Sequence, residues 1–162
     1  MTRRLSTGGP WEQPAGYSRA VAAGDFVFVS GCTSVVGGQV VHEGDPRAQT
    51  AQAIANVAEA LTALGAGLDD VVRTRMFVTD IARSAEYGGA HGAAFGEIRP
   101  ASSMIGITAL IDPRMLVEVE AVAFRPGIGE AGAGEAGAGE AGAGEAGAGE
   151  RGPAGHGPVA GA

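Results

Sequence analysis

The chain has 162 residues and a formal net charge of −7. The five glutamates and one arginine after residue 126 contribute −4, so residues 1–126 carry −3, which excludes the basic patch of a nucleic-acid-binding protein. The chain has neither a run of about 18 apolar residues that would span a membrane nor the apolar stretch of a secretory signal, and a single cysteine, Cys32, indicates a reducing, cytoplasmic setting without an internal disulfide.

The composition changes near residue 126. Residues 1–126 have the mixed apolar and polar texture of one globular domain. Residues 127–162 consist largely of a GEAGA repeat, whose evenly spaced glutamates line no face of a helix or a strand. Glycine-rich sequence with so few bulky apolar residues buries too little surface to offset its ordering entropy. We therefore expect residues 127–162 to form a disordered, solubilising acidic tail.

The N-terminal part of the domain is predicted to form strands. Residues 17–22 and 26–31 flank a turn at residues 23–25, and apolar residues on both faces of the second run suggest a strand that is covered on both sides. In that run one face holds Phe26, Phe28 and Ser30, and the other holds Val27, Val29 and Gly31. A turn at Gly37-Gly38 precedes another short strand.

Two helices are predicted further along the chain. Asp45 is a natural N-cap, Pro46 a natural first helical residue, and Gly65 supplies the stop. Between them, apolar side chains recur at helical spacing: Ala53, Ile54, Val57, Ala60, Leu61 and Leu64. The second helix, over residues 84–96, is weakened by internal glycines.

Residues 71–78, between the two helices, read as another strand. Its alternation places Arg73 and Arg75 on one face. The opposite face is predicted to hold Val72, Thr74 and Met76.

The last two predicted strands, residues 102–108 and 116–124, are joined by a short turn at Asp112-Pro113. In the second of them Glu118 and Glu120 point the same way, because a strand has a period of two residues. Two carboxylates on a strand otherwise built for burial need water, a partner chain or a ligand to satisfy them. This strand is therefore the first candidate position for a site.

The order of the elements predicts an α+β fold, in which two helices cover one face of a mixed sheet of about six strands. The strands nevertheless have apolar residues on both faces. The face without helices should then be buried by another copy of the chain, which predicts a homo-oligomer.

Several motifs occur in a characteristic order: Gly16-Tyr17, FVSG at residues 28–31, RPAS at residues 99–102 and LVEVEAVA at residues 116–123. Together with DDVVRTRMFVTD at residues 69–80, they make the chain resemble the RidA/YjgF family. These are reactive-intermediate (enamine/imine) deaminases, also labelled L-PSP endoribonucleases. The resemblance runs from about residue 10 to 125. It implies a chorismate-mutase-like (RidA-like) fold, assembled as a trimer with clefts between neighbouring subunits.

The resemblance also implies the residues of the cleft. The catalytic group would be Glu118, and the substrate-binding residues would be Tyr17, Ser30, Gly31, Ser102, Ser103 and Met104. Deaminating members have an arginine where this chain has Ser102, and that arginine binds the substrate carboxylate through a bidentate, charge-assisted pair. Losing such a pair costs on the order of 2–5 kcal/mol. We therefore expect a carboxylate contact that differs from the family's; Arg99, three residues earlier, either replaces the charge or is a solvated flank.

Two residues have competing roles. Glu118 can hold and polarise a water molecule for imine hydrolysis if burial raises its pKa toward neutral. Alternatively it forms an intersubunit hydrogen bond or ion pair with Arg73 or Arg75, while Glu120 is assigned a structural role. Cys32 directly follows the Ser-Gly pair of the cleft. Its thiol is a candidate catalytic nucleophile if its pKa is depressed, or else a small buried hydrophobe.

His42 and His91 have no partner at a metal-ligand spacing, so no metal and no other cofactor is assigned. The leading interpretation is a cofactor-independent hydrolase, an imine or enamine deaminase that acts on a small-molecule substrate in an intersubunit cleft of a homotrimer. The alternative is a non-catalytic trimer of the same fold that binds a small molecule as a sensor or a protective protein. Ribonuclease activity is implied only by the family's older label, and the missing basic patch argues against it.

Overall fold

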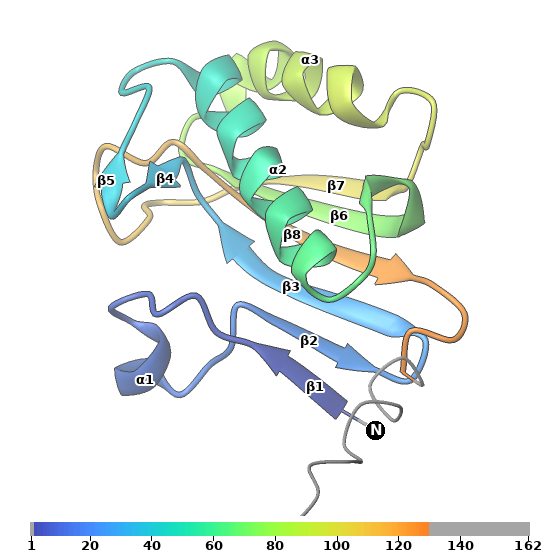
Figure 1. Ribbon diagram of the computed structural model, residues 1–162. Coiled ribbons are helices and arrows are strands. Elements are labelled where there is room, and N and C mark those ends of the chain that lie inside the picture. The colour runs from blue at the N-terminus through green and yellow to red at the C-terminus, as the bar shows by residue number, and fades with distance from the viewer. Residues whose placement is uncertain (1, 130–162) are drawn as a thin grey trace, which may run out of the picture.

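The computed structural model describes residues 2–129, and the predicted acidic tail therefore lies almost wholly outside the described residues (Figure 1). The strands are β1 (Thr2–Leu5), β2 (Ala20–Ala23), β3 (Phe26–Cys32), β4 (Val35–Val36), β5 (Gln39–Val40), β6 (Val71–Val78), β7 (Ala101–Gly106) and β8 (Val117–Phe124). The α-helices are α1 (Glu12–Ala15), α2 (Pro46–Ala63) and α3 (Ser84–Phe95). Short 3₁₀ turns at Leu68–Asp70 and Ile81–Arg83 lead into β6 and α3.

Six strands form one sheet in the order β1-β2-β3-β8-β6-β7. Neighbouring strands run antiparallel except β6 and β7, which are parallel. The two long helices, α2 and α3, pack side by side on one face of this sheet (Figure 1). The predicted α+β fold, with a six-stranded mixed sheet and two helices on one face, is confirmed.

The strand that completes the six is not the predicted one. The residues around the Gly37-Gly38 turn form a separate two-stranded hairpin, β4–β5, in which both glycines have a positive φ. The sixth strand is instead β1, which pairs with β2 at the edge of the sheet. Its four residues are too few to show a periodic signal in the sequence, and they are held by pairing with a distant segment rather than by their own pattern.

The predicted short turn between the last two strands is also wrong. β7 and β8 are not neighbours, because β6 lies between them and pairs with both. Residues 107–116 cross from one side of β6 to the other. A tight turn joins only adjacent antiparallel strands, and the sequence of this stretch does not reveal that β6 lies between the two strands that it connects.

The two helices begin where the sequence predicts. The Asp45 side chain accepts a hydrogen bond from the Ala48 backbone N–H (3.0 Å), and Pro46 is the first residue of α2. Gly65, one residue beyond the C-cap, has a φ of 89°, a left-handed conformation that glycine adopts without strain. The start of α2 is therefore fixed by local chemistry.

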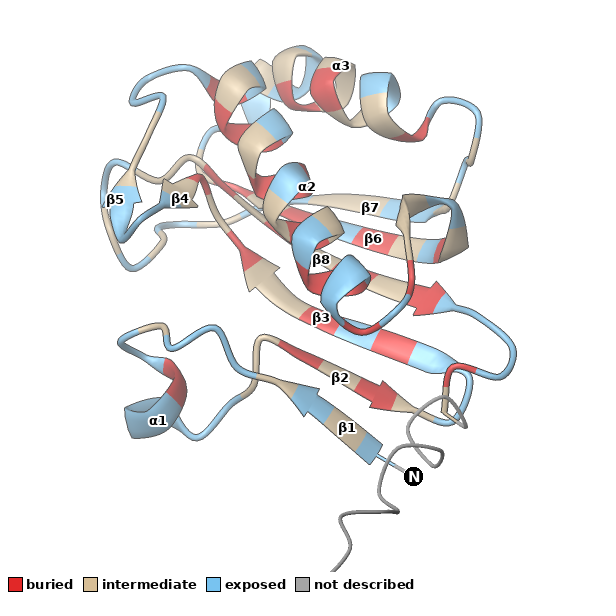
Figure 2. Cartoon of the chain, viewed as in Figure 1, coloured by how far each residue is buried: buried red, intermediate tan, exposed pale blue. Residues whose placement is uncertain are grey.

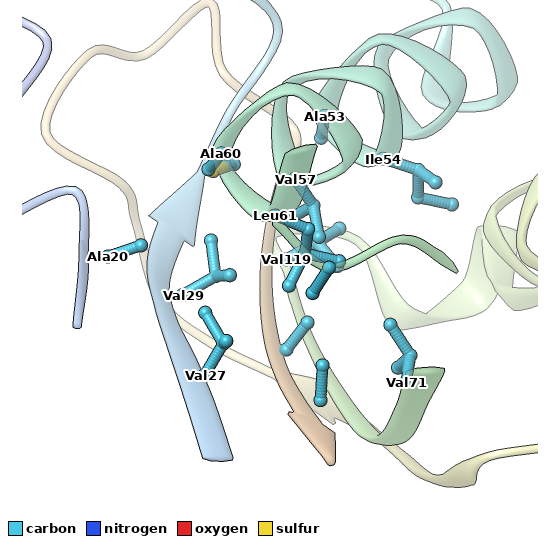
Figure 3. Packing of buried hydrophobic residues seen from close by; sticks show 14 of the residues in the cluster. Ala20, Val27, Val29, Ala53, Ile54, Val57, Ala60, Leu61, Val71 and Val119 are labelled. Atoms are coloured by element: carbon cyan, nitrogen blue, oxygen red, sulfur yellow. The ribbon is translucent and has the colours of Figure 1, made fainter. Parts of the chain in front are cut away.

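The core lies between α2 and the sheet (Figure 3). Val57 and Leu61 of α2 pack over Val27, Val29 and Val119 of β3 and β8, and all five side chains are buried. Burying one Val or Leu side chain contributes roughly 1.5–3 kcal/mol, so this layer is the main attachment of the helix to the sheet.

The packing continues past β8. Ile128 is buried in the same core cluster. Its carbonyl accepts a hydrogen bond from Arg3 Nη2 (3.0 Å), and the same nitrogen donates to the Leu64 carbonyl (2.9 Å). The folded unit therefore includes the first residues after Pro126.

The opposite face of the sheet has no helix over it and exposes large apolar side chains. Buried and exposed residues alternate along β3 (Figure 2), and Phe28 on its open side is 47% exposed. The rings of Phe26 and Phe124 lie on the same face, 5.1 Å apart between centroids. Val72 also lies exposed, contrary to its predicted place beside Thr74, because the register of β6 against β8 shifts after Val71.

A buried side chain of α2 holds the connection that leads into β8. Gln49 is fully buried; its Nε2 donates to the Arg114 carbonyl (2.8 Å), and its Oε1 accepts from the Leu116 N–H (2.8 Å). One amide thus satisfies two backbone groups of residues 107–116. Since Leu116 immediately precedes β8, this contact helps to set where β8 begins.

Replacing Gln49 by leucine is expected to lower the free energy of unfolding by about 2–4 kcal/mol, because two backbone groups lose their partner at about 1–3 kcal/mol each. Urea denaturation measures the change. The control is Gln52→Leu on the same helix, since Gln52 bonds only to the Asn56 side chain. That substitution is expected to change stability by less than about 1 kcal/mol, and equal effects of the two would contradict the role given to Gln49.

Candidate functional site

A β-bulge in β3 shapes the open face of the sheet. The register between β3 and β8 shifts by one residue between Val29 and Cys32. Both of these residues are buried on the helix side, whereas Gly31 lies against the Glu118 side chain. The sequence places Gly31 on the face of Val29, and this prediction is wrong because an extra residue in one strand reverses the alternation beyond it.

Glu118 is a half-buried carboxylate on the open face, opposite Phe77 of β6. The absent side chain of Gly31 makes room for it, since a Cβ at that position would overlap the carboxylate. Burial raises the pKa of Glu118, the negative charge of Glu120 raises it further, and the Arg19 guanidinium opposes both effects. Within residues 2–129 the carboxylate has neither a hydrogen bond nor an ion pair. A carboxylate in this condition is well placed to accept and return a proton.

Within residues 2–129 of the protomer Glu118 pairs with neither Arg73 nor Arg75, and the alternative of an intersubunit hydrogen bond or ion pair with one of them stays a prediction. Arg75 Nη1 instead lies 3.2 Å from Glu120 Oε2, and both side chains are solvent-accessible. An exposed pair of this kind contributes at most about 1 kcal/mol. Glu120 thus has a side-chain partner, whereas Glu118 has none among residues 2–129.

Arg19 is the residue of this region that sequence reasoning missed. Its Nη1 donates to the Gly31 carbonyl (2.6 Å) and lies 3.5 Å from Cys32 Sγ. Its Nη2 lies 3.4 Å from Tyr17 Oη, and its guanidinium stands 5.8 Å from the centre of the Tyr17 ring. Tyr17 and Arg19 are two residues apart at the entry to β2. That spacing was the available signal, because residues two apart on extended chain share a side.

Tyr17 lies between this cluster and a surface pocket of about 340 Å³ in the N-terminal arm. The pocket is lined by Ser6, Gly8, Gly9, Glu12, Gln13 and Tyr17. Glu12 is buried and accepts hydrogen bonds from the Ser6 and Thr7 side chains. Its burial raises the pKa of this carboxyl, but those hydrogen bonds and the Arg19 charge lower it to about 2. Glu12 is thus a fixed anion that holds the arm beside Tyr17.

Ser30 lies in the bulge, but its hydroxyl has a backbone partner. Ser30 Oγ donates to the Ser18 carbonyl (2.8 Å), and the Ser30 N–H donates to the Arg19 carbonyl (3.0 Å). These two bonds tie the segment that carries Tyr17 and Arg19 to β3. The predicted binding residues Tyr17, Ser30 and Gly31 are therefore brought together with Glu118.

Cys32 lies in the core and not on the open face, where the predicted cleft would be. Its side chain is buried on the helix side, and its Sγ donates to the Ser30 carbonyl (3.4 Å). Burial raises the pKa of the thiol, although the Arg19 charge opposes the rise. A buried, protonated thiol is a poor nucleophile. We therefore correct the nucleophilic role predicted for Cys32 in favour of a small core residue.

The three predicted binding residues of β7 do not all face the same way. Ser102 lies opposite the buried Thr74 of β6, whose hydroxyl donates to Ser102 Oγ (3.0 Å) and contacts His91 Nε2 (2.9 Å). Met104 packs against the core next to α3. Ser102 and Met104 therefore belong to the helix side, and in the protomer they do not join Glu118. The parallel register of β7 with β6 decides which side of the sheet each of these side chains lies on, and the sequence alone does not show that register.

Ser103 is the exception in β7. It pairs with Arg75, which places it on the open face. Two strands separate it from Gly31, because β6 and β8 lie between β7 and β3. Ser103 therefore shares the open face with Glu118, but it lies two strands away from Gly31.

Arg99, the possible replacement for the missing arginine, is exposed at the entry to β7. Its Nε donates to the Gly96 carbonyl (3.3 Å). Its backbone has a φ of 54°, a left-handed conformation that is uncommon outside glycine. It lies on the far side of β6 from β8, so it does not replace the charge near Glu118 in the protomer.

Metal-binding residues do not converge in the part of the chain that the structure describes: no three side chains of His, Cys, Asp or Glu form a possible metal site. His91 contacts Thr74, stacks beside Phe95 with 4.7 Å between ring centres, and has its pKa lowered by burial. Among residues 2–129, no helix is long and apolar enough to cross a membrane.

Residues 11–125 match the sequence model of a family that is described as Endoribonuclease L-PSP. The chain belongs to this family. A Streptomyces coelicolor protein is 39% identical over 126 residues, which cover 78% of this chain and 94% of that protein. The RutC family protein PH0854 of Pyrococcus horikoshii is 32% identical over 112 residues, which cover 67% of this chain and 86% of its own length.

Solved structures of the L-PSP family show the same fold. Rv2704 of Mycobacterium tuberculosis, a member of the YjgF/YER057c/UK114 family, superposes with a TM-score of 0.70 at 46% identity, covering 76% of this chain and 99% of that one. Yeast Mmf1 superposes with a TM-score of 0.69 at 26% identity, covering 77% of this chain and 99% of that one. The resemblance to the RidA/YjgF family, and the fold that it implies, are confirmed.

The charges around Glu118 predict how its pKa responds to substitution. Glu120→Gln is expected to lower this pKa because it removes a negative neighbour, and Arg19→Gln to raise it because it removes a positive one. Carbon-13 NMR titration of the side-chain carboxyls measures both. Glu86→Gln on α3, where Glu86 is paired with Arg83, is the control that leaves the Glu118 pKa unchanged. A fall on Arg19→Gln would contradict the electrostatic account.

Proposed function

We propose that this chain hydrolyses a small imine or enamine to a carbonyl compound and ammonia, without a cofactor, in a cleft between the subunits of a homotrimer in the cytoplasm. The observation that carries the proposal is Glu118: a half-buried carboxylate with a raised pKa and no partner among the described residues, packed against the bare backbone of Gly31. Membership of the RidA/YjgF family supports the same class of reaction.

The chemistry needs one group that moves protons and one open approach to the reacting carbon. As the water oxygen bonds to the C=N carbon, the Glu118 carboxylate takes a proton from the water and passes it to the nitrogen. The second water proton follows as the C–N bond breaks and the C=O bond forms, so the nitrogen leaves as ammonia. A carboxyl with a raised pKa is suited to both transfers, and the missing side chain of Gly31 leaves room for this carboxyl on the open face.

A neighbouring subunit is needed to enclose this site. In the protomer Glu118 lies on an open sheet face, and the pockets beside Tyr17 and beside Arg3 do not include it. The same face exposes aromatic side chains that a protomer interface would bury. These features support assembly over the open face, and the number of three subunits follows from the likeness to the RidA family.

The family is described as Endoribonuclease L-PSP, which raises RNA as an alternative substrate. Residues 1–126 carry a net charge of −3, and the open face presents Glu118 and Glu120. Arg73 and Arg75 share this face, but Arg75 is paired with Glu120. Among residues 2–129 the open face therefore does not present the cluster of unpaired cations that supplies most of the affinity for a polyanion. We therefore favour a small-molecule substrate over RNA.

Glu118→Gln is expected to lower kcat/KM for ammonia release from freshly generated 2-imino acids by about 10²- to 10⁴-fold, the usual contribution of a general acid–base group. Glutamine keeps the shape but cannot accept the proton. Glu120→Gln is the matched control, on the same strand and face, and is expected to change kcat/KM only a few-fold because Glu120 pairs with Arg75.

Two results of that assay would count against the proposal. Unchanged activity of Glu118→Gln would remove this residue from the mechanism. Absence of turnover on a broad panel of imines, together with saturable binding of a small acid, would favour the non-catalytic binding protein instead.

The assembly is tested by placing a charge on the open face. Phe28→Glu is expected to turn the trimer into monomers in sedimentation velocity at micromolar concentration, because a desolvated, unpaired carboxylate would have to be buried in the interface. Val36→Glu is the control: Val36 is about as exposed as Phe28 but lies in the β4–β5 hairpin. A wild-type protein that sediments as a monomer would overturn the proposed assembly.

A further inference from the structure

We infer that Arg19 is the carboxylate anchor of this cleft, and that it supplies the guanidinium that deaminating relatives carry at the position of Ser102. The substrate would then be a small 2-imino acid, or its enamine tautomer, held by its carboxylate on Arg19 with the reacting carbon near Glu118. The inference rests on the proposed hydrolysis for its chemistry, but the anchor can be tested by binding alone.

The guanidinium of Arg19 is held in place before any ligand arrives. Nη1 is fixed by the Gly31 carbonyl at 2.6 Å and lies beside Cys32 Sγ, while Nη2 is within 3.4 Å of Tyr17 Oη. The Tyr17 ring also stands beside the guanidinium. A cation that is oriented by its surroundings loses less conformational entropy on binding than a free surface arginine.

The contacts leave donors for a ligand. An arginine has five N–H groups, and the contacts to Gly31, Cys32 and Tyr17 occupy the Nη1 group and one N–H of Nη2. Within residues 2–129, Nε–H and the second Nη2–H have no acceptor. Planar N–H donors of this kind match the two oxygens of a carboxylate.

Arg19 and Glu118 both contact the same residue, Gly31. Arg19 binds the carbonyl of Gly31, and the Glu118 side chain packs against the Cα of the same residue. The two charged groups make no direct ion pair in the structure, yet each lies within electrostatic range of the other. In a 2-imino acid the carboxylate carbon is bonded directly to the imine carbon. Because Arg19 and Glu118 both lie against Gly31, a molecule of this size can have its carboxylate on Arg19 and its imine carbon beside Glu118.

The other cations are less suitable. Arg75 is paired with Glu120, and Arg73 lies opposite Val122, toward the far end of β8 from Glu118. Arg99 is beyond β6. Arg19 is thus the one guanidinium of the described residues in contact with both Tyr17 and Gly31.

The test uses 2-oxobutanoate and its uncharged amide, 2-oxobutanamide, as probes of the full chain, with affinity measured by NMR titration. Wild type is expected to bind the acid more tightly than the amide. Arg19→Gln is expected to weaken acid binding by about 10- to 100-fold, the usual contribution of hydrogen bonds to a charged group, and to leave amide binding unchanged. Arg99→Gln, the matched control at the rival arginine, is expected to leave both affinities unchanged.

Arg19→Lys provides a second variant if the glutamine variant does not fold, which thermal melting reveals. A lysine keeps the charge but presents a point donor and not a planar fork, so acid binding is expected to weaken at least about 5-fold with amide binding retained. Unchanged acid binding in the folded variant would overturn the anchor. So would a wild type that binds the acid no better than the amide, or a loss confined to Arg99→Gln.

Ammonia release from 2-iminobutanoate, measured on the same proteins, separates the two proposals. No release by wild type, combined with loss of acid binding in Arg19→Gln, would refute the hydrolysis and support the anchor. Release by wild type that Arg19→Gln retains, with acid binding also retained, would support the hydrolysis and refute the anchor.

Discussion

The structure depends on a helix layer that covers only one face of a six-stranded sheet. Beneath α2 and α3 the strands present small or branched residues, and these pack to form the core. On the other face nothing in the protomer covers Phe26, Phe28 and Phe124, and these aromatic rings share that face with Glu118 and Glu120. A sheet face that was exposed only to solvent would not need both the aromatic rings and the two carboxylates. The same one-sided cover therefore gives the protomer its core and leaves aromatic and acidic side chains exposed on the opposite face.

A single extra residue in β3 shapes the candidate site on that face. The shift between Val29 and Cys32 sends Cys32 into the core and brings Gly31 against Glu118. Without it, strict alternation would put Gly31 under the helices and leave the carboxylate beside a side chain. Bulges are frequent next to functional sites because they change the direction of a few side chains while the rest of the sheet keeps its pairing.

The sequence predicts features that depend on local chemistry and fails where pairing between distant segments decides. Asp45 and Pro46 mark the start of α2, and the acidic face of β8 follows from a period of two. In β3 the bulge at Gly31 breaks the two-residue period, and nothing in the sequence signals it. The face of Ser102 depends on the parallel register of β7 with β6, and Arg19 joins the site only because β2 pairs with β3. Glu118 was therefore predictable, but its neighbours only in part.

Arg19 affects the pKa of acidic groups on both sides of the sheet, and its effect depends on what it binds. In the free protein its charge opposes the rise in the pKa of both Cys32 and Glu118. The negative charge of a substrate carboxylate on Arg19 would offset the positive charge of Arg19, so the pKa of Glu118 would rise further when the substrate is bound. The carboxylate would then be a stronger proton acceptor at the moment when water must be activated. An uncharged ligand would produce no such rise, so the anchor would couple substrate selection to proton transfer.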